Sequence, residues 1–328
     1  MIAVTGATGL LGSFVVKKLL HEKCEVVGIK RKGSNTNLLQ GYENKVNWRE
    51  ADILDALSLE AALKDVDCVI HTAALVSFNP RQTKKVFAVN VEGTRNVVNA
   101  CLELNIPRLI HISSVAALGR EKGIINLNEQ AKWTESPLNS IYAESKYFAE
   151  LEVFRGQEEG LSTAIINPSI ILAPADWTKS SAQVFNYVWR EKPFYTTGSF
   201  NYVDVRDVAD MVFSLSSAPI NGERIIANGG TSTYQTIFEE IAKRFHKKKP
   251  GIHLKETVVT IASWLEEILS FAIGREPLFT RQSSRMACAI FIYENHKAAE
   301  VLNMKFRSLE DTLDWCCGYY LQNVTTNK

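Results

Sequence analysis

A tyrosine and a lysine four residues apart carry the clearest chemical potential in the chain, in the segment Tyr142-Ala143-Glu144-Ser145-Lys146. On a helix this spacing places both side chains on one face. A phenol has a pKa of about 10, too high for easy proton transfer at neutral pH, and a nearby ammonium lowers it. The pair can therefore exchange a proton with a substrate, although a surface helix can carry the same spacing by chance.

Two serines follow another candidate strand and add a hydrogen-bond donor to this chemistry. Residues 109–112 form an apolar run that ends at Ser113 and Ser114. The carboxyl ends of parallel strands lie next to a bound cofactor. A serine hydroxyl at that edge can donate a hydrogen bond to a substrate carbonyl. Together with the tyrosine, the serines indicate proton-coupled chemistry on a carbonyl or an alcohol.

The glycine-rich turn near the start of the chain predicts where the cofactor binds. Thr5-Gly6-Ala7-Thr8-Gly9-Leu10-Leu11-Gly12 lies between a short apolar strand at 2–4 and a helical pattern at 12–21. Gly6 permits a tight turn, Gly9 lets the backbone approach a pyrophosphate, and Gly12 lets helix and strand pack closely. Free N–H groups at the helix start then face the phosphates. The flanking strand and helix supply the context that a dinucleotide site requires.

Strands and helices alternate through the first half of the chain. This alternation predicts an α/β fold, a doubly wound parallel sheet of the Rossmann type with a smaller C-terminal substrate-binding lobe. We expect a dinucleotide-binding domain at 1–166, completed by about 201–228, and the substrate-binding lobe at 167–200 and 229–328. The expected strands lie at 2–4, 25–29, 66–72, 108–112 and 163–167, and the expected helices at 12–21, 58–64, 86–105, 141–160 and 256–273.

Composition and charge favour a globular enzyme and argue against other classes of protein. Of 328 residues, 46% are hydrophobic and 22% are charged, which is ordinary for a soluble domain. The net charge of +1 gives no global field for nucleic acid or an anionic membrane. No clean apolar run is long enough to span a bilayer. A strand that begins at residue 2 leaves no room for a signal peptide.

The cysteines and histidines predict no metal site. The six cysteines contain no Cys-x-x-Cys pair, so we expect reduced thiols and a cytoplasmic protein. His71 and His111 lie in apolar strand-like runs, which favours a place in the core over metal ligation. The basic run at 243–249 is expected to end a helix, where cations complement the dipole, rather than to bind nucleic acid.

With these residues together, the chain resembles the extended short-chain dehydrogenases/reductases, most closely their dihydroflavonol-reductase-like and hydroxysteroid-dehydrogenase-like branch. The motifs cover most of residues 1–215 in the family's order, and the set is far more specific than any single member. They are Thr5-Gly6-x-x-Gly9-x-x-Gly12, Asp52-Ile53, His71-Thr72-Ala73-Ala74, Asn90-Val91-x-Gly93-Thr94, Ser113-Ser114, Tyr142-x-x-x-Lys146, Asn167-Pro168 and Tyr202-Val203-Asp204-Val205-x-Asp207-Val208-Ala209.

The resemblance implies catalytic roles by position. Ser114 matches the catalytic serine, with Ser113 the weaker match, Tyr142 matches the acid/base, and Lys146 matches its helper, which also orients the cofactor. The resemblance further implies a homodimer formed through the helices that carry Asn90 and Tyr142.

The resemblance also implies a set of cofactor contacts. Asp52 and Ile53 match the adenine contacts, and Pro168 matches the residue that sets the nicotinamide face. For Asn90 a helix cap or a packing role is an equal alternative. Asp204 and Asp207 are expected to hold a turn between lobes. The cofactor-binding residues implied in all are Gly6, Thr8, Gly9, Leu10, Leu11, Gly12, Arg31, Asp52, Ile53, Thr72, Ala73, Ala74, Asn90, Ser113, Tyr142, Lys146 and Pro168.

Two departures from the family pattern bear on the substrate. Asn167-Pro168 stands where nucleotide-sugar enzymes of this family usually carry Arg-Pro, and residues 196–202 hold no basic side chain for a diphosphate. The branch that this variant resembles reduces ketones or aldehydes on mostly apolar molecules. Apolar residues of the C-terminal half suit such a substrate, although for most of them we expect a place in that lobe's core. They are Trp264, Leu265, Phe271, Leu278 and Phe279.

Arg31 predicts the choice of cofactor. NAD-binding versions of the fold carry an acid near the end of the second strand, which holds the ribose 2′-hydroxyl. Here that strand ends in Lys30-Arg31-Lys32, and Glu25 lies at its start. A guanidinium can bind the 2′-phosphate of NADP with two charge-assisted hydrogen bonds. Lys30 is expected on the opposite face. We therefore expect NADP rather than NAD, with a solvated basic turn as the alternative.

These inferences predict an NADP(H)-dependent oxidoreductase that reduces a ketone or aldehyde on a small, largely apolar substrate. Two alternatives remain open. One is a nucleotide-sugar epimerase or dehydratase that uses bound NAD transiently. The other is a cofactor-sensing regulator without catalysis, against which the intact serine, tyrosine and lysine argue. The expected partner is a small carbonyl or alcohol compound, without nucleic acid or membrane.

Overall fold

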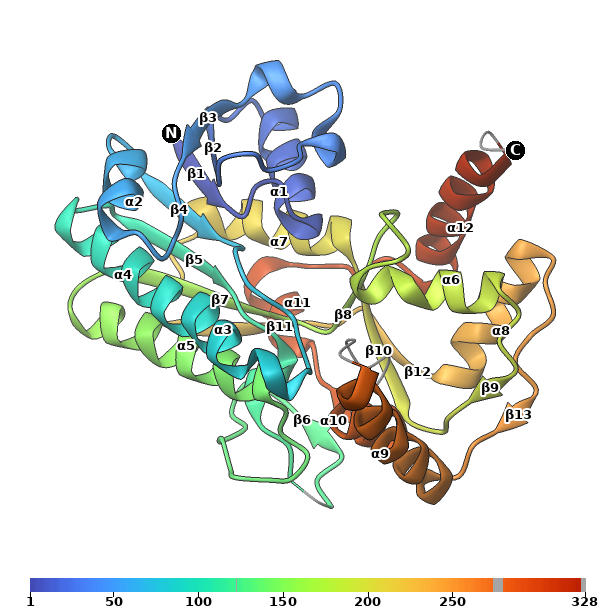
Figure 1. Cartoon of the computed structure of the whole chain (residues 1–328). Coiled ribbons are helices and arrows are strands. Elements are labelled where there is room, and N and C mark those ends of the chain that lie inside the picture. Colours follow the sequence, from blue (N-terminus) through green and yellow to red (C-terminus); the bar gives the residue numbers. More distant parts are fainter. Residues whose placement is uncertain (122, 274–279, 326–328) are drawn as a thin grey trace.

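A seven-stranded parallel sheet forms the centre of the computed structural model, which describes residues 1–121, 123–273 and 280–325 (Figure 1). Its strands, in chain order, are β1 Ile2–Thr5, β2 Val26–Lys30, β3 Asn47–Glu50, β4 Cys68–His71, β5 Arg108–Ile112, β7 Ser162–Pro168 and β11 Glu223–Ala227. In space they follow the order β11-β7-β5-β4-β1-β2-β3, and every pairing is parallel. The order reverses between β1 and β4, and ligands of such sheets bind at that point, outside the carboxyl ends of the strands.

Helices cover both faces of the sheet, which confirms the doubly wound α/β fold. On one face α1 (Leu10–His21), α7 (Val205–Ser217) and α11 (His296–Leu302) pack their apolar residues against the strands. On the other face lie α2 (Ala56–Leu63), α4 (Gly93–Glu103) and α5 (Ile141–Glu158). Because both faces are covered, the central strands are buried at every residue and mostly apolar without alternation, as in β4 and β5.

Two elements in the first half of the chain differ from the sequence prediction. Strand β3 was not predicted, because Asn47–Glu50 is polar and only partly buried at the sheet edge. The continuous helix expected at 86–105 is interrupted. A short helix α3 (Thr83–Phe87) passes through a π-helical turn (Ala88–Glu92) into α4. Such turns insert one residue per helical turn and often occur at functional sites.

The remaining elements lie beyond the carboxyl edge of the sheet, on the right and lower side of Figure 1. Strands β8, β10 and β12 form a three-stranded sheet, and β9·β13 and β6·β14 are two-stranded pairs. Aromatic residues fill the core between α6, α8 and α12. The bounds are β6 Asn126–Leu127, β8 Ile170–Leu172, α6 Gln183–Trp189, β9 Phe194–Tyr195, β10 Ser199–Asp204, β12 Gly230–Thr233, α8 Tyr234–Phe245, β13 Ile252–His253, α9 Glu256–Ile273, α10 Arg281–Cys288, β14 Ile292–Tyr293 and α12 Leu309–Thr325.

Helix α9 has the predicted bounds, but its expected core residues are exposed. Trp264 and Leu265 are 51% and 48% exposed, so the core position expected for most of the five apolar residues is wrong for these two. The side chains of these two residues face outward, because α9 packs on α10 at the edge of the molecule. Leu278 and Phe279 and the side chain of Phe271 lie outside the described residues. Within the residues that the structure describes, no helix is long and apolar enough to cross a membrane.

Candidate active site

The glycine turn lies directly under the start of α1. Gly6 has a φ of +67°, a conformation that favours glycine. A Cβ on Gly12 would lie 2.2 Å from the carbonyl oxygen of Gly6, so only glycine permits this approach of helix and turn. Gly9 precedes the helix and provides no side-chain cap. The first N–H groups of α1 are therefore available to an anion. Thr8, Leu10 and Leu11 complete the turn and are half-buried.

Arg31 is the first residue after β2 and is exposed. Its carbonyl accepts a hydrogen bond from the Ser34 amide at 3.0 Å, which turns the chain sharply away from the sheet. Lys30, the last residue of β2, lies over the Trp48 ring at 5.5 Å. Arg31 forms no ion pair with any residue in the described part of the chain, which leaves its guanidinium available.

Asp52 and Ile53 follow β3 at the same edge. One carboxylate oxygen of Asp52 accepts the amide of Leu54 at 3.0 Å, which fixes the turn. Ile53 is buried against Gly93, where a Cβ would lie 2.5 Å from the isoleucine Cδ1. The Asn96 amide donates to the Ile53 carbonyl at 2.9 Å. These contacts hold the two residues beside the carboxyl end of β2, the strand that pairs with β3.

Asn90 fastens the loop that follows β4. Its side-chain oxygen accepts the Leu75 amide at 2.7 Å, and its Nδ2 donates to the Leu75 carbonyl at 3.0 Å and to Ser145 Oγ at 2.9 Å. Thr72 Oγ1 donates to the Thr5 carbonyl at 2.7 Å and holds the other end of the segment that contains Ala73 and Ala74. Because its amide is fully engaged, Asn90 positions this loop, which corresponds to the packing alternative.

Ser114 and Tyr142 meet at the carboxyl edge of β5. Ser114 caps the short 3₁₀ turn Val115–Leu118 by accepting the Ala116 amide at 3.2 Å. Its hydroxyl also hydrogen-bonds with the hydroxyl of Tyr142, the second residue of α5 after its Ser140 cap. Burial raises the pKa of Tyr142 to about 12, while the Ser114 hydrogen bond and the Arg120 charge act in the opposite direction.

Lys146 reaches the backbone at the end of β5. Its ammonium donates to the Ile112 carbonyl at 2.8 Å and lies 3.2 Å from His111 Nε2. Burial lowers its pKa to about 8. The sequence predicted that this ammonium lowers the pKa of Tyr142, but burial raises that pKa, and the charge that opposes the rise is that of Arg120. Helical spacing fixes a shared face, whereas the long lysine side chain is free to reach the acceptors at the end of β5.

The two histidines behind the site lie in the core, as predicted. His71 and His111 are fully buried and their rings lie 5.2 Å apart. His71 is held between the hydroxyls of Thr5 at 2.7 Å and Thr94 at 3.0 Å. Burial lowers the pKa of His71 to about 3, so its ring is neutral. No cluster of metal-binding side chains occurs among residues 1–121, 123–273 and 280–325.

One buried carboxyl group, that of Glu150, was not identified from the sequence. Glu150 lies one helical turn after Lys146 and accepts the Asn167 amide at 2.6 Å. Burial raises the pKa of Glu150. Asn167 also donates to the Ser114 carbonyl at 2.9 Å, and Pro168 follows it at the end of β7. The spacing Lys146-x-x-x-Glu150 could have indicated this group, because it places Glu150 on the helical face that carries Tyr142 and Lys146.

Asp204 and Asp207 hold a turn, as predicted. Asp204 caps α7 by accepting the Arg206 amide at 2.8 Å. Asp207 binds both the amide and the guanidinium of Arg307. Arg206 in turn lies 3.9 Å from the ring centre of Trp315. The two carboxylates therefore connect α7 with the segment that leads into α12.

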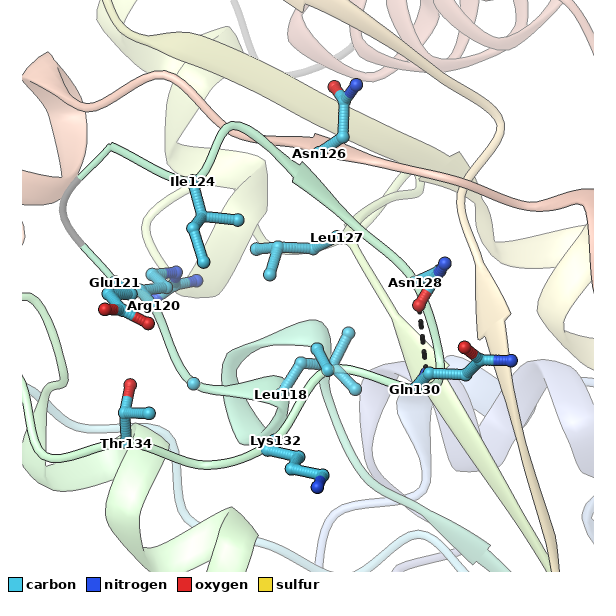
Figure 2. A pocket seen from close by; sticks show the side chains of 12 residues that line it. Leu118, Arg120, Glu121, Ile124, Asn126, Leu127, Asn128, Gln130, Lys132 and Thr134 are labelled. Carbon is cyan, nitrogen blue, oxygen red and sulfur yellow. Dashed lines mark hydrogen bonds between the residues drawn. The ribbon is translucent and has the colours of Figure 1, made fainter.

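A pocket of about 420 Å³ lies next to the 3₁₀ turn that Ser114 caps (Figure 2). It is formed by the chain that follows Ser114, and the trio of Ser114, Tyr142 and Lys146 does not line it. Asn128 Oδ1 accepts the Gln130 amide at 3.0 Å and shapes one wall. The lining residues are Leu118, Gly119, Arg120, Glu121, Ile124, Asn126, Leu127, Asn128, Gln130, Ala131, Lys132 and Thr134.

Comparisons with known proteins agree with this architecture. Residues 2–227 match the model of the NAD dependent epimerase/dehydratase family. A protein of Synechocystis sp. named "Putative dihydroflavonol 4-reductase" is 26% identical over 94% of this chain and 91% of its own length. Cinnamoyl-CoA reductase 1 of Oryza sativa is 32% identical over 64% of this chain and 65% of its own. The crystal structure of gox2253 superimposes with a TM-score of 0.84 at 28% identity and covers 98% of both chains.

Proposed function

Because the chain belongs to the NAD dependent epimerase/dehydratase family and is an NAD(P)-dependent oxidoreductase, we propose that it uses NADP(H) to reduce a ketone or aldehyde on a small, largely apolar substrate. The observation that supports this most is the hydrogen bond between Ser114 and Tyr142 at the carboxyl edge of the sheet. Relatives named as dihydroflavonol and cinnamoyl-CoA reductases support the same class of substrate.

In the proposed mechanism the phenol of Tyr142 protonates the developing alkoxide. Ser114 donates a hydrogen bond to the same oxygen and polarises the carbonyl. Lys146 orients the nicotinamide ribose, and Pro168 borders the nicotinamide. When bound, the cofactor supplies the hydride. Since burial keeps the pKa of Tyr142 at about 12, the phenol is in its proton-donating form at neutral pH.

The proposed cofactor site follows the carboxyl edge of β1, β2, β3 and β4. The N-terminus of α1 binds the pyrophosphate, Arg31 binds the 2′-phosphate, and Asp52 and Ile53 contact the adenine. The loop after β4, which Asn90 holds in place, lies along the cofactor ribose in this proposal. The remaining proposed contacts are Gly6, Thr8, Gly9, Leu10, Leu11, Gly12, Thr72, Ala73, Ala74 and Ser113.

A substrate screen tests this proposal. NADPH absorbance is followed with apolar ketones and aldehydes and with UDP- and dTDP-sugars. Oxidation of NADPH by the apolar compounds, with weak binding of the sugars, is the expected result. We place the substrate-binding lobe at 167–200 and 229–328, and strand β10, which crosses its boundary, carries no basic residue for a diphosphate. Micromolar binding of a nucleotide sugar, or an epimerised product, would favour the epimerase alternative.

The proposed homodimer gives a separate prediction. On α5 Phe148 and Leu151 are 43% and 42% exposed, and Phe148 lies 6.0 Å from Phe87 of α3. This apolar surface suits a contact between two copies through the helices that carry Asn90 and Tyr142. Phe148→Glu should therefore give a monomer by light scattering, whereas Leu57→Glu, an exposed apolar position on α2, should not. A monomeric wild-type protein would contradict the dimer.

A further inference from the structure

Arg120 is a buried arginine near Tyr142, the proposed proton donor. Arg120 follows the 3₁₀ turn that begins after Ser114 and is only 9% exposed. Its Nε donates to the Tyr293 hydroxyl at 3.1 Å, and its Nη1 lies 3.4 Å from Met286 Sδ. The guanidinium carbon lies 5.5 Å from the ring centre of Phe291. Residues of β14 and α10, far away in the sequence, thus enclose this cation.

Arg120 lacks a counter-ion. In the described part of the chain no carboxylate forms an ion pair with it, and the neighbouring Glu121 is exposed and does not bind it. A hydroxyl and a thioether are neutral, and sulfur is a weak acceptor. Burying a guanidinium without an anion is costly. Among the described residues two of its five N–H donors have partners, which leaves three for an acceptor in the pocket that Arg120 lines.

The position of Arg120 connects the pocket with the proposed reaction centre. Arg120 lines the pocket of about 420 Å³, with the exposed cation Lys132 on its wall (Figure 2). Its charge also lowers the pKa values of Tyr142 and Tyr234, against the effect of burial. The guanidinium therefore lies within electrostatic reach of the phenol that would protonate the product.

We propose that Arg120 binds a carboxylate of the substrate, so that the enzyme reduces an oxo acid, or oxidises the matching hydroxy acid. A guanidinium presents two parallel N–H donors that match a carboxylate, and Lys132 adds a second positive charge. The carbonyl then lies at Ser114 and Tyr142, with the carboxylate held on the pocket side. This inference rests on the proposed function and specifies its substrate class.

The wild-type holoprotein with NADP provides the first test. Binding of benzoylformate, levulinate and 4-acetylbenzoate is measured by calorimetry, each against its methyl ester, which has the same carbonyl without the charge. At least one acid should bind at least about tenfold more tightly than its ester, since a hydrogen bond to a charged group contributes a factor of this order. Equal binding of acids and esters, or no binding of any acid, would overturn the proposal.

Variants then assign the effect to Arg120. Arg120→Met should weaken acid binding by about tenfold or more and leave ester binding unchanged, and Arg120→Lys should restore part of the loss. The matched control is Arg285→Met, which replaces an exposed arginine on α10 next to Met286. This variant should change neither acid binding nor ester binding. Equal loss of acid and ester binding in Arg120→Met would indicate a structural role and contradict the proposal. If that variant melts early, the wild-type comparison decides.

The two proposals fail in different ways. If NADPH is oxidised by the esters but not by the acids, the carboxylate site is wrong and the reductase stands. If the acids bind through Arg120 but no compound oxidises NADPH, the site stands and the proposed reductase is wrong.

Discussion

Tyr142→Phe should lower the turnover of the reductase reaction by about 10²–10⁴-fold, the usual contribution of a positioned proton donor. The substitution removes one hydroxyl and keeps the ring, which packs edge-on against Phe78 at 5.9 Å. Stability and cofactor binding should therefore change little. The measurement is single-turnover NADPH oxidation, with NADPH binding followed by fluorescence.

The control for this experiment lies on the same helix. Tyr147 stacks on Trp133 with ring centres 4.5 Å apart and has no hydrogen bond to Ser114. Tyr147→Phe should retain the wild-type rate. Near-normal single-turnover rates in Tyr142→Phe would remove Tyr142 from the mechanism.

Arg31→Ala should weaken NADP binding by roughly 10- to 100-fold and leave NAD binding almost unchanged. A hydrogen bond to a charged group contributes about 1.5–3 kcal/mol, and each 1.4 kcal/mol is about tenfold in affinity. Arg31 is exposed at the end of β2, so its removal leaves no cavity. The dissociation constants of both cofactors are measured by calorimetry.

Lys30→Ala is the matched control for the arginine. It removes the adjacent cation, which lies on the Trp48 side, and should leave NADP binding close to wild type. Equal affinity of the wild-type protein for NAD and NADP, or an equal loss for both cofactors in Arg31→Ala, would show that Arg31 does not select the cofactor.

Local sequence predicted the parts of the molecule that local geometry determines. The glycine turn is one example, because Gly6 and Gly12 are required by a φ of +67° and by a 2.2 Å approach that depend on neighbouring residues. The central strands β4 and β5 are another, since burial on both faces requires continuous apolar runs. Helix α5, expected at 141–160, was predicted almost to its last residue.

The remaining features depend on contacts between distant segments. Arg120 follows no motif, and its environment comes from Met286, Phe291 and Tyr293, more than 160 residues later. The direction of Lys146 depends on which acceptor its long side chain reaches, which helical spacing does not specify. Trp264 shows a further limit of sequence-based prediction. Apolar periodicity identifies a helical face, but it does not show whether another element covers that face.

The central claim is that this protein transfers a hydride from NADPH to a substrate carbonyl with Tyr142 as the proton donor. Mass spectrometry of the product formed from NADPH that carries deuterium on the transferable C4 position tests it directly. We predict one deuterium on the new carbinol carbon with wild-type protein, and formation of the same labelled product about 10²–10⁴-fold more slowly with Tyr142→Phe. An unlabelled product formed without net oxidation of NADPH, as in an epimerisation, would contradict the account.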